Sequence, residues 1–146
     1  MKWISVAALL CVCLLAGGCI DKDVPFGLAM KESAQVIYPY INKMTVEGSE
    51  LNISGMAKVG EEALPVFDYQ IEKLSKMPVS DKYVKMKADY IGGLQNVRSA
   101  YSIFASLRND TNTSVTHLND GRIEQAKTLL GSGLRNISSA IKQLGG

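Results

Sequence analysis

Apolar side chains recur along most of the chain at intervals of three or four residues, which is the spacing of amphipathic helices. The most regular stripe lies within residues 80–108 and consists of Tyr90, Leu94, Val97, Tyr101 and Phe104. A second regular stripe lies within residues 121–144 and consists of Ile123, Ala126, Leu130, Leu134, Ile137, Ile141 and Leu144. Ser80, which follows the break at Met77-Pro78, suits a helix start. The pattern predicts helices over 80–108 and 121–144.

The first half of the domain is less regular but has two further apolar faces. One consists of Phe26, Met30, Ile37, Ile41 and Met44, and the other of Met56, Val59, Ala63, Phe67, Ile71 and Leu74. These faces predict helices over about 25–46 and 50–76. Pro39 and Pro65 fall inside them, so we expect Pro39 to kink its helix, and either helix can be split.

Four amphipathic helices joined by short turns bury their apolar faces most economically as an antiparallel four-helix bundle. The predicted fold is therefore all-α, with one bundle domain over residues 25–146. Glycine lowers helix stability unless a neighbouring backbone approaches closely. The sequence has two such groups, so we expect tight helix crossings or flexible points at Gly92-Gly93 and at Gly131-Ser132-Gly133.

The amino terminus has the pattern of an export signal. Lys2 is the only charged residue before Asp21, and an apolar stretch over residues 3–16 leads to two glycines and Cys19. The segment Leu15-Ala16-Gly17-Gly18-Cys19 resembles the lipobox of prokaryotic lipoproteins, although Ala16 stands where leucine is commonest and Leu15 lies one position further out.

This resemblance implies cleavage between Gly18 and Cys19 and lipid attachment to Cys19. Residues 1–18 would then be the signal peptide and residues 19–24 the acylated cysteine and a short tether. Two alternatives stay open. Residues 3–20 are just long enough for an uncleaved membrane anchor, and a signal of this kind also serves plain secretion.

Division of the chain at Cys19 changes the composition of the remaining domain. The full chain of 146 residues has three cysteines, and Cys11 and Cys13 belong to the leader. With Cys19 acylated, the domain has no free thiol for a disulfide, a zinc site or a nucleophile. Loss of Lys2 leaves 15 basic and 14 acidic residues. This near-neutral charge argues against nucleic-acid binding.

The residues that usually carry catalysis are scarce. His117 is the only histidine, and Glu61 and Glu62 are adjacent, so their side chains diverge around a helix. No His/Cys cluster or di-iron signature occurs, and we expect no metal, no cofactor and no catalysis. An enzyme that uses His117 with Asp110 or Asp120 is the least favoured hypothesis.

Tyrosines near a proline supply the alternative of a small-ligand site. Tyr38 and Tyr40 flank Pro39, where a kink would open space between helices. This hypothesis predicts a tyrosine-lined pocket of about 300 Å³ or more. The competing interpretation is core packing, because tyrosine suits the wet ends of a bundle core.

Asn-x-Ser/Thr acceptors for glycosylation are more frequent than the composition predicts. They begin at Asn52, Asn109, Asn112 and Asn136, whereas chance gives about one. Together with the lipobox they would indicate an archaeal surface lipoprotein. The function we expect is a helical module, anchored by lipid on the extracytoplasmic face of a membrane, that binds a protein or envelope component there.

Overall fold

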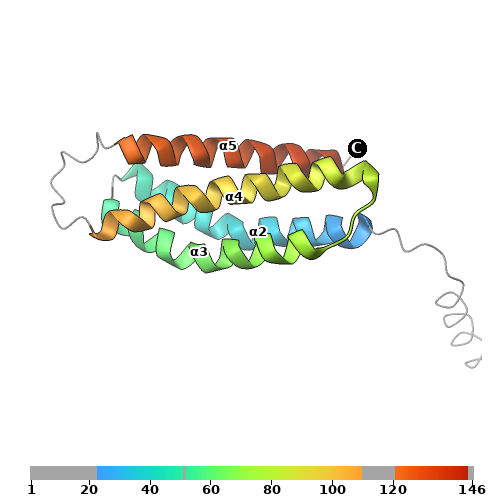
Figure 1. Cartoon of the computed structure of the whole chain (residues 1–146). Coiled ribbons are helices and arrows are strands. Elements are labelled where there is room, and N and C mark those ends of the chain that lie inside the picture. The colour runs from blue at the N-terminus through green and yellow to red at the C-terminus, as the bar shows by residue number, and fades with distance from the viewer. Residues whose placement is uncertain (1–22, 51, 110–120, 145–146) are drawn as a thin grey trace, which may run out of the picture.

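The computed structural model describes residues 23–50, 52–109 and 121–144. In these residues the chain forms four α-helices that pack side by side: α2 (Asp23–Ser49), α3 (Ile53–Lys76), α4 (Val84–Ser106) and α5 (Gly121–Leu144) (Figure 1). Two short 3₁₀ turns, η1 (Asp81–Tyr83) and η2 (Leu107–Asn109), flank α4. The predicted all-α, antiparallel four-helix bundle is confirmed.

Ion pairs on the bundle surface record the antiparallel register of α2 and α3. Glu32 pairs with Lys73 at 3.3 Å, and Lys43 pairs with Glu62 at 3.6 Å, so one helix rises as the other descends. Exposed pairs of this kind contribute up to about 1 kcal/mol each. These pairs therefore show the register of the two helices but add little to the stability of the fold.

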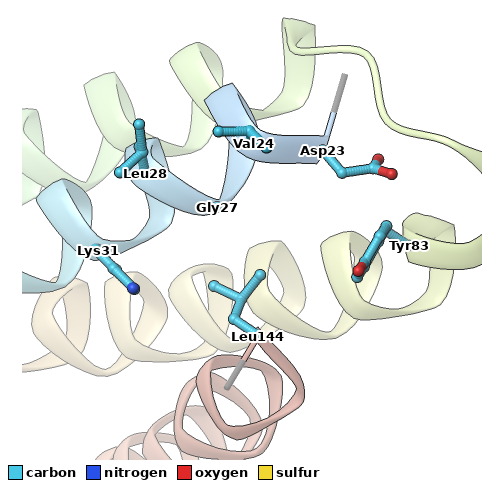
Figure 2. Close-up of a pocket in the computed structure, with 7 residues that line it drawn as sticks. All are labelled: Asp23, Val24, Gly27, Leu28, Lys31, Tyr83 and Leu144. Carbon is cyan, nitrogen blue, oxygen red and sulfur yellow. The ribbon is translucent and has the colours of Figure 1, made fainter. Parts of the chain in front are cut away.

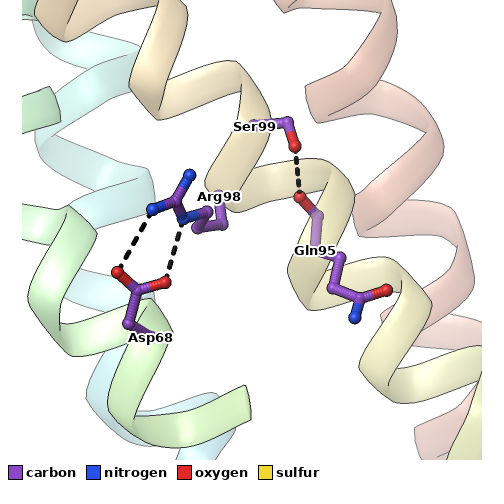
Figure 3. Close-up of polar contacts among 4 residues, drawn as sticks. All are labelled: Asp68, Gln95, Arg98 and Ser99. Atoms are coloured by element: carbon purple, nitrogen blue, oxygen red, sulfur yellow. Dashed lines mark hydrogen bonds and ion pairs between the residues drawn. The ribbon is translucent and has the colours of Figure 1, made fainter. Parts of the chain in front are cut away.

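A bidentate ion pair joins α3 to α4 in the same antiparallel sense. Arg98 donates from Nε and Nη2 to the two carboxylate oxygens of Asp68, at 2.9 and 3.3 Å (Figure 3). This hydrogen bonding raises the pKa of Arg98 above its usual value. One residue along α4, Ser99 Oγ donates to the Gln95 carbonyl at 2.9 Å, a local bond that leaves the helix intact. Of Arg98 and Ser99, only Arg98 therefore forms a bond between α3 and α4.

The core consists of the apolar faces that the sequence predicts. Every residue of the α4 stripe is at most 2% exposed. On α2 and α3 the predicted faces are buried except for Ile41 and Ile71, which are partly buried against the core. Four residues of the α5 face are also only partly buried: Leu130, Leu134, Ile141 and Leu144. The outer helix α5 is thus less completely covered than α4.

The helix bounds differ from the predictions in three places. α2 runs through Pro39 to Ser49, and α3 contains Pro65, so neither proline ends its helix. α3 begins at Ile53 and not at residue 50, because Asn52 caps it: Asn52 Oδ1 accepts from the Gly55 N–H at 3.0 Å. The third predicted helix divides into η1, α4 and η2.

Ser80 has a different role from the expected helix cap. Its side chain makes no capping bond to η1. Instead, the Ser80 hydroxyl donates to Asp23 Oδ2 at 2.7 Å, and the Ser80 N–H donates to Asp23 Oδ1 at 2.8 Å. The carboxylate of the first described residue therefore ties the start of α2 to the connection between α3 and α4.

The close approach of α4 and α5 confirms one of the two readings of the glycine groups. A Cβ atom added to Gly93 would lie 2.8 Å from the Gly133 carbonyl oxygen, and one added to Gly133 would lie 2.6 Å from the Gly93 carbonyl oxygen. Carbon and oxygen atoms do not approach so closely, so only glycine fits at either position. Gly92, by contrast, has nothing within 4 Å of such an atom.

Two buried tyrosines of α4 differ in their hydrogen bonding. The Tyr90 hydroxyl donates to the Met30 carbonyl oxygen at 3.0 Å, whereas the Tyr101 hydroxyl has no hydrogen-bond partner among the described residues. We therefore expect Tyr90→Phe to lower the free energy of unfolding by about 1 kcal/mol and Tyr101→Phe to leave it unchanged or raise it by about 1 kcal/mol. Urea unfolding of both variants checks this, and equal losses would contradict it.

The same tyrosines give the protein a predicted sensitivity to alkali. Burial raises the pKa of Tyr101 and, against a smaller opposing effect of the Ser33 hydroxyl, that of Tyr90. An unfolded tyrosine ionises near pH 10, so the folded state retains protons that the unfolded state loses above that value. The free energy of unfolding should therefore fall as pH rises above about 10. The decline should be shallower in Tyr101→Phe, as urea unfolding at about pH 9 and pH 11 would show.

Candidate functional site

A shallow pocket opens at the end of the bundle where α2 begins and α5 ends (Figure 2). Its volume is about 270 Å³. The lining comes from the first turns of α2, from η1 and from the last residue of α5, and consists of Asp23, Val24, Gly27, Leu28, Lys31, Tyr83 and Leu144. We call this end the basal end and these residues the basal pocket.

The basal pocket depends on a close contact between α2 and α5. A Cβ atom added to Gly27 would lie 3.3 Å from Leu144 Cδ2, so the absence of a side chain at Gly27 lets Leu144 pack directly on the α2 backbone. In Figure 2 the Leu144 side chain points toward the first turns of α2. Leu144, Val24 and Leu28 are the aliphatic residues of the lining.

The polar groups of the basal pocket lie at its edges and belong to few residues. Asp23 is engaged by Ser80, and Lys31 is an exposed amine at the rim. The third polar group of the lining is the Tyr83 hydroxyl. In the described part of the chain no three His, Cys, Asp or Glu side chains come together as a metal site. The apolar groups of the lining are suited to apolar contact.

The two tyrosines predicted to line a ligand pocket lie elsewhere on α2. The Tyr38 side chain is 61% exposed. Tyr40 is half-buried against the core, and Lys43 Nζ lies 5.7 Å from its ring centroid. Neither residue lines the basal pocket. Their role in ligand binding stays a prediction.

The predicted glycosylation sites have different surroundings. Asn136 is exposed on α5. Asn52 is also exposed, but its Nδ2 atom, which a glycan would occupy, donates to Glu47 Oε2 at 2.6 Å while its Oδ1 caps α3. Asn109 is the last residue of η2, and Asn112 lies outside the described residues. Glycosylation therefore stays a prediction at all four positions.

Several residues that the sequence singles out also lie outside the described part of the chain. They are Gly18 and Cys19 of the lipobox-like segment and His117 with its candidate partners Asp110 and Asp120. No helix among the described residues combines the length and apolar character that a membrane crossing requires.

The residues of the basal pocket were not predicted as a site. Val24 and Leu28 are one helical turn apart and lie off the predicted core face of Phe26 and Met30, and each is 57% exposed. An apolar pair outside the core stripe is the signal that sequence analysis could have used.

Comparisons with known proteins add no relative to this description. No family model, curated protein or solved structure matches the chain.

Proposed function

We propose that the protein is a lipid-anchored helical module that works without catalysis by binding a protein or envelope component at the extracytoplasmic face of a membrane. The observation that carries this proposal is the amino-terminal pattern. An apolar stretch ends in two glycines and Cys19, and charged residues follow from Asp21. This order is typical of a segment that is exported, cleaved and acylated at the cysteine.

The short distance between Cys19 and the bundle supports a role near the membrane. α2 begins at Asp23, four residues after Cys19. Four residues span at most about 14 Å even when fully extended. An acylated Cys19 would therefore hold the bundle against the bilayer, and the partners most available to it would be membrane components or proteins anchored beside it.

The composition of the described surface supports binding over chemistry. Acidic and basic side chains alternate on it and form ion pairs across and along helices, as in Glu32–Lys73 and Asp68–Arg98. These exposed pairs leave no strong single-sign field of the kind that attracts nucleic acid.

Cross-linking in native membranes tests the binding part of this proposal. A photoreactive residue at Tyr69, which is 61% exposed on α3, would capture a partner on that side of the bundle, and the same residue at Tyr38 would sample α2. We expect at least one position to give a discrete adduct that an unrelated anchored bundle does not give. Adducts only with abundant membrane proteins, shared with the control bundle, would count against a specific partner.

A further inference from the structure

The basal end exposes more apolar surface than its place in a bundle explains. Val24 and Leu28 are each 57% exposed, and Val84 at the start of α4 is 53% exposed. Val24 and Leu28 border a pocket whose other apolar walls are Tyr83 and Leu144. Val24, Leu28, Tyr83 and Leu144 form one apolar patch, which we call the basal patch.

The first turns of α2 are apolar on both sides, which is unusual for a surface helix. Phe26 and Met30 are buried in the bundle, while Val24 and Leu28 point away from it. A helix that is apolar all round is normally covered on all sides. Within the described residues no other helix covers Val24 and Leu28, so the basal patch is open to contact from outside the bundle.

Lysines adjoin the basal patch. Lys31 lines the pocket, and Lys82 Nζ lies 5.0 Å from the Tyr83 ring centroid. The Asp23 carboxylate, which also lines the pocket, accepts two hydrogen bonds from Ser80. An apolar centre with an aromatic ring and flanking lysines matches a membrane interface, because lysine stems extend over apolar groups while the amines reach anionic headgroups.

The position of the patch in the chain selects the membrane over other occupants. Asp23, the first residue of α2, is four residues from Cys19 and adjoins Val24. Any anchor at Cys19 therefore brings the basal end to the bilayer before any other part of the bundle.

We infer that the basal patch contacts the headgroup region of the bilayer, so that the four helices stand on the membrane by the end at which α2 begins. The inference rests on the proposed lipid anchor at Cys19. Leu28 and Val24 insert among the lipid headgroups, Lys31 and Lys82 contact anionic lipid, and the far end of the bundle projects from the membrane.

Quenching of a fluorescent label by nitroxide-bearing lipid tests this orientation. The label is attached to Leu28→Cys in the full chain carrying Cys11→Ser and Cys13→Ser. The acylated protein is then reconstituted in vesicles of phosphatidylcholine and phosphatidylglycerol. Val46→Cys is the matched control, because Val46 lies on the same helix and is 53% exposed. It is 18 residues further along α2, a distance of about 27 Å.

We expect lipid quenching at position 28 to exceed that at position 46 at least twofold. Equal, weak quenching while the chain floats with the vesicles would overturn the orientation and leave the lipid anchor standing. A label at 28 that is shielded from aqueous iodide but unquenched by lipid would show that a protein covers the patch, which also overturns it. A chain that does not float with vesicles would refute the anchor and the orientation together.

Discussion

Replacement of Gly93 by alanine should lower the free energy of unfolding by about 2–3 kcal/mol. The new Cβ would lie 2.8 Å from both the Gly133 carbonyl oxygen and Ile137 Cγ1, and 3.0 Å from the Ile137 nitrogen. Two of these three neighbours are backbone atoms, so no change of side-chain rotamer relieves the clash. α4 and α5 would have to separate along their shared interface.

The adjacent glycine provides the control. An alanine at Gly92 meets nothing within 4 Å, so it should only improve helix propensity and raise the free energy of unfolding by about 0.5–1 kcal/mol. Urea unfolding followed by circular dichroism compares the two variants. Opposite signs at neighbouring positions are the expected result. If Gly93→Ala also stabilised the protein, the close crossing of α4 and α5 would be wrong.

Substitution of Cys19 by serine should abolish the incorporation of labelled fatty acid into the protein. A serine hydroxyl cannot form the thioether through which a lipobox cysteine is modified, so the resemblance to lipoproteins predicts complete loss. The resemblance also makes Cys19 the first residue of the mature chain, so we expect the variant to retain residues 1–18. Metabolic labelling with a fatty acid that carries an alkyne measures the first effect, and amino-terminal sequencing measures the second.

The two cysteines of the leader are matched controls for the Cys19 substitution. Cys11 and Cys13 lie in the apolar stretch and have no assigned role. Their serine variants should incorporate label as the unmodified chain does. Label that persists in Cys19→Ser, or that disappears in Cys13→Ser, would place the modification elsewhere and remove the basis for the anchor.

The apolar stripes could be predicted because they depend only on local periodicity. Tyr90, Leu94 and Val97 share one side of α4 at helical spacing, and that side is the one buried. The α4–α5 crossing was predicted only in part. Four glycines stood out in the sequence, but which of them meet depends on the register between two helices, and that register selects Gly93 and Gly133.

The basal pocket could not be predicted, because its walls come from residues far apart in the chain. Leu144 reaches Gly27 only if α5 ends level with the start of α2, and that depends on the lengths of all the helices together. Likewise Ser80 is a good helix cap by residue type, but its hydroxyl donates a hydrogen bond to Asp23 instead. The role of Asn52 was equally hard to predict. This residue begins an Asn-x-Ser glycosylation pattern, but in the structure its side chain caps α3.

Intact mass spectrometry of the protein purified from membranes tests the lipid anchor most directly. A chain that begins at Cys19 and carries the added mass of attached lipid is the predicted result. A chain that retains residues 1–18, or one that begins near residue 19 without added lipid, would contradict it.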